Sequence, residues 1–365
     1  MSKLSYRFNS LILKVLPKRC SQKYLLYLRM KKDDTLMSSR VSRDVLTPKE
    51  HSEVNEFWSR FYNIRHTAHE YYTQITGKFY KEYIPNSLWK RIIDPYFNDW
   101  KLAHYMDNKC YYHRMFTVYG VKQPDLVAYR LNNIWFDSND EVITWDSVVE
   151  KSMNAKECFI KKAVESWGGS GVYYFSSVCE TKEKLQSVIN SLNGDLVIQE
   201  GVKQCEALAK VNTDSVNTIR VLSFLKMDGS VLILSSVLRM GVKGAKVDNA
   251  SNGGIVVGIQ DNGRLKDVAY NIDGDVYTEH PSSHVILNNI EIPQFHNILN
   301  IIKRTHPKFP HFRLVAWDFA IDRTETPVLI EVNFNDAGLE SLQLTNGPVF
   351  GSRTEEILSE VFLKK

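Results

Sequence analysis

Three oxygen-bearing side chains lie close together in two apolar stretches near the end of the sequence. Asp318 interrupts Val315–Ala320, and Glu331 and Asn333 interrupt Val328–Asn335. Both stretches are predicted strands joined by a turn at 322–327. Because alternate residues of a strand share a face, Glu331 and Asn333 point the same way, and Asp318 can join them from the neighbouring strand. Two carboxylates and an amide suit Mg²⁺ held jointly with phosphate oxygens. The alternative is a salt bridge from Asp318 to a core arginine.

A lysine-rich strand followed by glycines predicts a triphosphate site. Lys161 and Lys162 end the run CFIKK, and four small residues follow shortly after them: Gly168, Gly169, Ser170 and Gly171. A lysine supplies positive charge, and glycines allow backbone N–H groups to approach phosphate oxygens. The pattern is not a Walker loop, because no Gly-Lys-Ser/Thr follows and the next element is a strand. The alternative is a flexible turn.

The end of another predicted strand offers a place for a nucleoside. Leu196–Gln199 leads into Glu200, Gly201 and Val202, whose backbone N–H and C=O groups can read an adenine. Glu206 is a candidate for binding the ribose hydroxyls. The alternative is an ordinary strand end.

Two arginines and a polar turn form a fourth group. Arg220 and Arg239 lie on strand-like segments, and two guanidiniums can clamp an anion such as a phosphate or carboxylate. The turn at 247–254 contains Asp248 and Asn249, which can bring polar side chains to the same anion. Either arginine by itself is more typical of a structural ion pair.

The elements that must position these residues can be predicted from local patterns. Residues 1–100 are mainly helical, and Thr47-Pro48-Lys49-Glu50 predicts a capped helix start. Further helices are expected at 108–119, 182–192 and 294–305, with strands at 126–131 and 134–136 joined by an Asn-Asn turn. We expect four parts: a basic, mainly helical region 1–100; a small α/β unit 101–155; a lid with the Gly-rich loop 156–202; and a catalytic part 203–365.

Composition narrows the class of protein. The chain has 365 residues with 46 Lys and Arg against 42 Asp and Glu, and 43% of residues are hydrophobic, which excludes intrinsic disorder. Residues 1–45 carry 11 Lys and Arg against 3 Asp and Glu. Such a basic arm can meet an anionic membrane surface or nucleic acid. The alternative is a solvated surface segment. The five cysteines show no metal-ligand spacing. We expect a cytoplasmic protein, with the arm able to touch the inner face of the membrane.

Taken in order, these motifs resemble the ATP-grasp superfamily. FIKK…GGSG, NTIRVLSF, LRMG, VDNASNGG, WDFA and LIEVNFN are similar to the sugar-transfer-associated ATP-grasp proteins of bacterial surface-polysaccharide genes. The resemblance covers 107–351. It implies an α+β fold in which two subdomains grip ATP, preceded by the helical region. It also implies that Lys109 and Lys161 bind phosphate, although Lys162 competes with Lys161, and that Asp318, Glu331 and Asn333 hold Mg²⁺, as two ions. Arg220, Arg239, Asp248 and Asn249 would face the γ-phosphate and the acceptor.

The activity that this resemblance implies is ATP-dependent joining of a carboxylate to an amine through an acyl phosphate. The substrates would be a small-molecule or sugar-linked carboxylate and an amine in capsule or surface-polysaccharide synthesis, with no nucleic acid as partner. The alternatives are a kinase of the same fold, which stops after phosphorylation, and a non-catalytic nucleotide-binding adaptor. The oligomeric state is not predicted.

Overall fold

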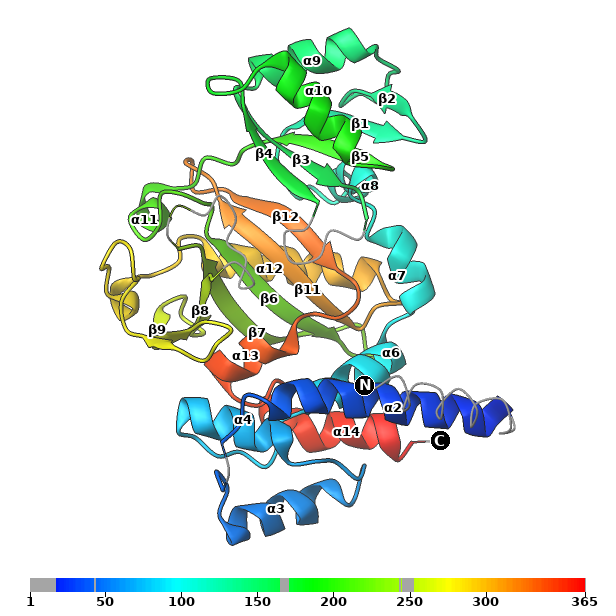
Figure 1. Cartoon of the computed structure of the whole chain (residues 1–365), viewed down its shortest axis with the longest axis vertical. Helices are drawn as coiled ribbons and strands as arrows, with labels where there is room; N and C mark the ends of the chain where they lie inside the picture. Colours follow the sequence, from blue (N-terminus) through cyan, green and yellow to red (C-terminus); the bar gives the residue numbers. More distant parts are fainter. Residues whose placement is uncertain (1–17, 43, 165–170, 243, 245–252, 365) are drawn as a thin grey trace. The chain divides into compact units, whose positions relative to one another are not determined.

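The computed structural model describes residues 18–42, 44–164, 171–242, 244 and 253–364, with side chains from Tyr24 onward (Figure 1). The chain divides into two compact units. The first, here the helical unit, comprises Met1–Tyr96 and Gly347–Lys365, and the second, the sheet unit, is Phe97–Asn346. The sequence-based division instead placed the last residues with the catalytic part. Their contacts explain the difference, because Phe362 packs against Tyr62 and Glu355 pairs with Arg60.

The helical unit confirms that the N-terminal region is mainly α-helix. The predicted cap is present: the Glu50 N–H donates to Thr47 Oγ1, and the Thr47 N–H donates to the Glu50 carboxylate. Val54, Phe57 and Trp58 form the buried stripe of that helix. The elements are α2 Lys18–Ser38, α3 Pro48–Trp58, α4 Thr67–Thr76, α5 Asn86–Leu88, the π-helical η1 Trp89–Ile93, α6 Asp94–Phe97, η6 Gly351–Arg353 and α14 Thr354–Phe362.

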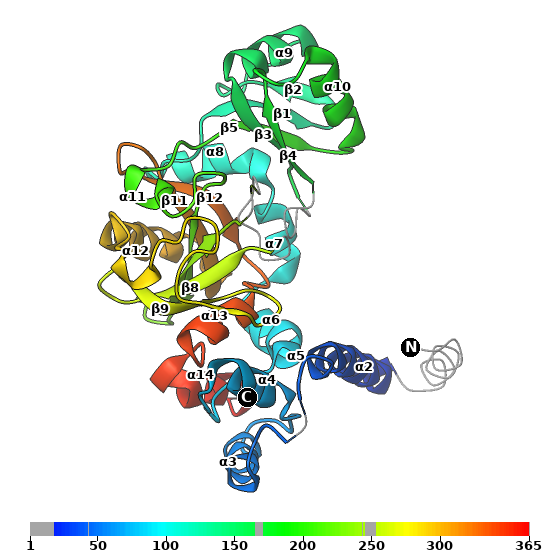
Figure 2. The ribbon, with the colours of Figure 1, turned by 60° about the vertical axis from the view of Figure 1, so that its left-hand side comes forward.

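The first sheet of the sheet unit has five antiparallel strands in the order β2-β1-β5-β3-β4. Its hairpin β1–β2 turns at Asn132 and Asn133, whose φ angles of 46° and 65° asparagine tolerates better than most residues. Helices α9 and α10 cover one face (Figure 2). The strands are β1 Leu126–Leu131, β2 Ile134–Phe136, β3 Glu157–Lys162, β4 Val172–Ser176 and β5 Leu196–Glu200; the helices are α9 Trp145–Asn154 and α10 Lys182–Ser191.

The second sheet has seven antiparallel strands in the order β10-β9-β8-β7-β6-β11-β12. It confirms the expected α+β class and the two strands that carry the oxygen cluster. The strands are β6 Thr218–Leu225, β7 Val231–Met240, β8 Ile255–Ile259, β9 Leu265–Tyr270, β10 Val276–Tyr277, β11 Leu314–Ile321 and β12 Pro327–Asn333.

The remaining helices of this unit pack around the two sheets. Helix α12 lays Ile298 and Ile302 on one face of the seven-stranded sheet, in the same core cluster as Val221 and Trp317. These helices are α7 Trp100–Met106, α8 Lys109–Thr117, α11 Glu206–Ala209, α12 Phe295–Thr305, α13 Leu339–Asn346 and the 3₁₀ turns η4 Leu287–Asn289 and η5 His306–Lys308. Among the described residues, no helix is long and apolar enough to cross a membrane.

A buried polar network holds α12 and its following turn to the sheet. The Trp317 indole N–H donates to Ser223 Oγ at 2.8 Å, and Ser223 Oγ lies 2.8 Å from His306 Nδ1. His306 Nε2 lies 2.8 Å from the Phe312 carbonyl oxygen, which can only accept, so the proton is on Nε2 and Nδ1 accepts. Burial lowers the pKa of His306 from 6.5 to about 4, so the network is built on a neutral imidazole.

The His306 pKa predicts how stability depends on pH. Between about 6.5 and about 4 the unfolded chain binds a proton at His306 that the folded chain does not, so the free energy of unfolding falls as the pH falls through this window. The His306 contribution is up to about 1.4 kcal/mol for each pH unit. Urea unfolding at several pH values should therefore show a shallower pH dependence for His306→Gln than for the wild type. Equal slopes of unfolding free energy against pH in the two proteins would contradict the lowered pKa of His306.

Candidate active site

A row of charged side chains crosses three neighbouring strands of the seven-stranded sheet. In the strand register Glu331 of β12 lies opposite Asp318 of β11, which lies opposite Arg220 of β6. Residues that flank these positions, Ile219, Trp317 and Val332 among them, belong to the core that α12 covers. Because side chains alternate along a strand, Arg220, Asp318 and Glu331 project from the face away from α12. The predicted juxtaposition of Asp318, Glu331 and Asn333 is therefore present.

Asp318 is the centre of this row. It is 3% exposed, and the Arg220 guanidinium donates to both of its oxygens at 2.7 and 2.6 Å. Arg239 of β7 approaches the same carboxylate at 3.4 Å. Burial favours the neutral acid, but the charges and hydrogen bonds of Arg220, together with Arg239 and Lys109, hold the pKa of Asp318 below its usual value. Asp318 thus forms the arginine salt bridge that the sequence left as an alternative, while remaining an anion beside Glu331.

Lys109 faces the second carboxylate. It is the first residue of α8, where Asn108 caps the helix by accepting from the Cys110 N–H. Lys109 Nζ lies 2.9 Å from Glu331 Oε1, with the lysine side chain 9% exposed and that of Glu331 29% exposed. Lys109 and Glu331 are 222 positions apart in the sequence, and the fold brings them together.

Asp107 is a further acidic group at this site, and its role was not recognised from the sequence. Its Oδ1 accepts from the Phe334 N–H at 3.3 Å. Burial raises the pKa of Asp107 to about 7, although that hydrogen bond and Lys109 oppose the shift. Its position two residues before Lys109, within the Asp107-Asn108-Lys109 motif, was the available signal.

The donor set fits Mg²⁺ when phosphate oxygens complete it. Asp318 and Glu331 supply carboxylate oxygens from facing positions, and Asn333 lies two residues along β12 on the same side. The Asn333 Nδ2 atom is buried and has no hydrogen-bond partner in the described part of the chain. Since the two ends of an amide are assigned rather than observed, Oδ1 can occupy that position and bind a cation. The described residues contain no cluster of three or more His, Cys, Asp or Glu suited to a metal by itself.

The two competing lysines point to opposite faces of the five-stranded sheet. Cys158 and Ile160 lie in the core under α9 and α10. By alternation Lys161 points away from these helices, as does Val197, which lies opposite it in the register and contacts Cys110 of α8. Lys161 Nζ donates to Gln199 Oε1 at 3.0 Å. Lys162 points to the helix-covered face, and its side chain lies against Gly171, whose φ is +77°.

The segment after β5 borders a cavity. The Glu200 N–H donates to the Asp125 carbonyl and the Gly201 N–H to the Glu157 carbonyl, whereas the Val202 N–H donates to no described group. A cavity of about 280 Å³ opens here; it is lined by Glu200, Gly201, Val202, Lys203, the segment 122–125, Asp322, Arg323, Thr324 and Val328. Glu206, the proposed ribose ligand, does not line this cavity; its side chain is 84% exposed and pairs with Lys210 at 2.9 Å.

Five expected site residues lie outside the described residues. They are Gly168, Gly169 and Ser170 of the Gly-rich loop and Asp248 and Asn249 of the polar turn. Arg239 precedes that turn, near the end of β7. The assignments of these five residues stay predictions.

Residues 90–359 match the protein-family model described as sugar-transfer associated ATP-grasp. No curated protein matches the chain. Among solved structures, D-alanyl-alanine synthetase A from Vibrio cholerae is 15% identical, with a TM-score of 0.41 over 70% of this chain and 62% of the other. N5-carboxyaminoimidazole synthase from Aspergillus clavatus, in complex with ADP and 5-aminoimidazole ribonucleotide, is 11% identical, with a TM-score of 0.42 over 72% and 54%. The chain thus covers less than two thirds of either protein, and its activity must be argued from its own site.

Removing the charge of Asp318 should destabilise the sheet unit. The Asp318→Asn variant leaves two partly buried guanidiniums without their anion, which costs about 3 kcal/mol in the free energy of unfolding. A matched control is Asp140→Asn, because Asp140 pairs with Arg114 at a site where both side chains are more than one third exposed. Exposed pairs contribute about 0–1 kcal/mol. Urea unfolding of both variants tests the contrast, and similar losses would contradict the central role of Asp318.

Proposed function

The chain belongs to the sugar-transfer associated ATP-grasp family, and from this premise we propose that it is an ATP-dependent ligase that joins a carboxylate to an amine. The observation that carries the proposal is the row of Glu331, Asp318 and Arg220 on one face of the seven-stranded sheet, with Lys109 and Arg239 beside it. Three cations and two carboxylates concentrated at one place suit the transfer of a phosphoryl group, whose charge they can neutralise.

The nucleotide would lie between the five-stranded sheet and this row. We assign the adenine to the cavity beside Glu200, Gly201 and Val202, where the Val202 N–H is available to a ring nitrogen. Lys161 projects from the face of its sheet opposite α9 and α10 and would bind phosphate together with Lys109. Gly168–Gly171 would close over the phosphates and exclude water.

Asp318, Glu331 and Asn333 would hold Mg²⁺, as two ions. The metal would supply charge neutralisation for the phosphates and act as a Lewis acid on the transferred group. A cation bound at Glu331 Oε1 would displace the Lys109 ammonium from its contact at 2.9 Å, and a phosphate oxygen is the natural new partner of Lys109.

The proposed reaction has two steps. A carboxylate oxygen of the acceptor attacks the γ-phosphorus, the bond to ADP breaks, and an acyl phosphate forms. The nitrogen of an amine then attacks the acyl carbon, inorganic phosphate leaves and the amine loses a proton. Arg220 and Arg239, both 16% exposed, are placed to bind the carboxylate and the phosphoryl oxygens. No serine or cysteine nucleophile is needed, and burial raises the pKa of the Cys158 thiol to about 12, which keeps it protonated.

The family is described as associated with sugar transfer, and we propose a sugar-linked carboxylate in the assembly of capsule or another surface polysaccharide as the substrate. The basic arm would bring the protein to the inner face of the membrane. Its described portion in α2 exposes Arg29, Lys31 and Lys32. Their charge suits an anionic surface.

ADP release from Mg·ATP should require both substrates. Purified protein offered uronic acids and amino acids singly and in pairs should release ADP efficiently only when a carboxylate and an amine are both present. A stable phosphorylated product formed from a single compound would replace the ligase with a kinase. ATP binding without turnover across a broad panel would favour the nucleotide-binding adaptor.

Glu331→Gln should lower turnover by two or more orders of magnitude, because it removes one of the two carboxylates while preserving volume. The control is Glu150→Gln, whose side chain is exposed on α9, the helix that covers the face of the five-stranded sheet opposite Lys161. Circular dichroism should show that both variants are folded. Near-normal ADP release by Glu331→Gln would show that the metal site has been placed wrongly.

A further inference from the structure

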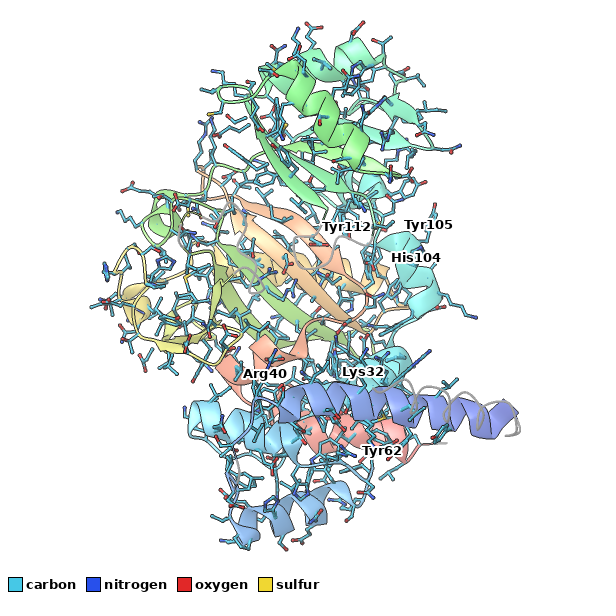
Figure 3. All side chains as sticks on the ribbon, in the orientation of Figure 1. Lys32, Arg40, Tyr62, His104, Tyr105 and Tyr112 are labelled. Atoms are coloured by element: carbon cyan, nitrogen blue, oxygen red, sulfur yellow. The ribbon has the colours of Figure 1, made fainter. Side chains whose placement is uncertain are left out.

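Helix α8 belongs to the cores of both sheets in the sheet unit. Cys110 packs in a cluster with Val197 of β5, whereas Tyr112 and Phe116 pack with Trp317 of β11. Two bonds fasten the start of α8 to the five-stranded sheet: the Lys109 N–H donates to the Ala163 carbonyl at 2.9 Å, and the Cys110 thiol donates to the Leu196 carbonyl at 3.3 Å. Tyr112 projects from α8 in the region between the two sheets (Figure 3).

The same corner, formed by the end of α7 and the start of α8, contacts β12 at three closely spaced residues. Lys109 pairs with Glu331 at 2.9 Å. The Tyr112 hydroxyl donates to the Val332 carbonyl at 2.8 Å. The Phe334 N–H donates to the Asp107 carboxylate at 3.3 Å. These contacts bracket Asn333, so they fix the whole segment that carries Glu331 and Asn333.

The topology shows why β12 needs these contacts. In the described structure β12 is an edge strand, paired only with β11 on its other side. Near the start of β12 the Leu329 N–H donates to the Lys122 carbonyl. Near its end the Val332 carbonyl accepts from the Tyr112 hydroxyl, and just beyond it the Phe334 N–H donates to the Asp107 carboxylate. A buried carbonyl without a hydrogen-bond partner is unfavourable, and the Tyr112 hydroxyl supplies the partner for the Val332 carbonyl. The ring itself is 3% exposed and packs in the core.

We propose that Tyr112 and Asp107 are positioning residues that hold Glu331 and Asn333 in the geometry required for Mg·ATP. The inference rests on the proposed function, because it assigns the cation to these two side chains. Metal ligands must be held within about half an ångström of their productive positions. An edge strand fixed at Val332 and Phe334 meets this demand, whereas the same strand without those bonds can shift. Because α8 is also bonded to the five-stranded sheet, Tyr112 and Asp107 set the metal ligands relative to the phosphate-binding Lys161.

The test uses calorimetry to measure the affinity of the full chain for ATP with Mg²⁺ and without it. Tyr112→Phe removes one hydroxyl and keeps the ring, so the fold should be retained. We expect the gain in ATP affinity on adding Mg²⁺ to fall about tenfold, as suits the loss of one hydrogen bond, while affinity in EDTA stays unchanged. A purely structural role would leave the gain unaltered.

Three further variants sharpen the comparison. Tyr72→Phe is the matched control, because Tyr72 is equally buried and its hydroxyl donates to Asn86 Oδ1 at 3.1 Å within the helical unit, with no bond to α8 or β12 among the described residues. This control should leave the gain in ATP affinity on adding Mg²⁺ at the wild-type value. At the second position, Asp107→Asn keeps an acceptor for the Phe334 N–H and should lose less of the gain than Asp107→Ala.

The possible outcomes separate the two proposals. An unchanged Mg²⁺-dependent gain in ATP affinity in Tyr112→Phe, or an equal loss of that gain in Tyr72→Phe, overturns the positioning role while leaving the proposed function standing. A wild-type protein whose ATP affinity does not respond to Mg²⁺ overturns the proposed metal site and this inference together. A loss of the Mg²⁺-dependent gain in ATP affinity that is confined to Tyr112→Phe and Asp107→Ala supports the positioning role.

Discussion

The buried carboxylate of Asp318 is the constraint around which the sheet unit is arranged. An anion that is 3% exposed in the middle of a β-sheet is unfavourable unless cations compensate it. Arg220 compensates it with two hydrogen bonds from the neighbouring strand, and Arg239 adds a weaker contact from the strand beyond. The register of β6, β7 and β11 is therefore tied to charge as well as to apolar packing. This arrangement gathers on one face the groups that a phosphoryl-transfer site needs.

Glu331 is held differently, and the difference has consequences for function. Its partner Lys109 comes from a helix, not from the sheet, and its side chain is 29% exposed. An ion pair at that exposure is easier to exchange for a new partner than the enclosed Asp318 pair. The site thus combines one fixed carboxylate with one that can be released, which suits a centre where substrate phosphates and a cation must enter together.

The α7–α8 corner connects this site to the rest of the sheet unit. One short helix packs in both cores and bonds to both sheets, so the five-stranded sheet and β12 are held to a common element. The lysine that pairs with Glu331 and the tyrosine that supports Val332 lie one turn apart on α8. The spacing between Lys161 and the proposed metal ligands then depends on that helix.

The amino-acid sequence alone determined the local structure and the family. The Thr47 cap, the Asn132-Asn133 hairpin and the strands carrying Asp318 and Glu331 follow from short-range preferences that tertiary packing did not override. The alternation of side chains also placed Glu331 and Asn333 on one face. What the sequence left open were choices between partners: Lys161 or Lys162, and a metal or an arginine for Asp318. Only the tertiary structure turned Lys161 to the face opposite α9 and α10, paired Asp318 with Arg220 and brought Asp107 and Tyr112 to β12. The last three contacts join residues about 100 to 230 positions apart. Strand register and helix packing decide such contacts, and neither is encoded in local spacing.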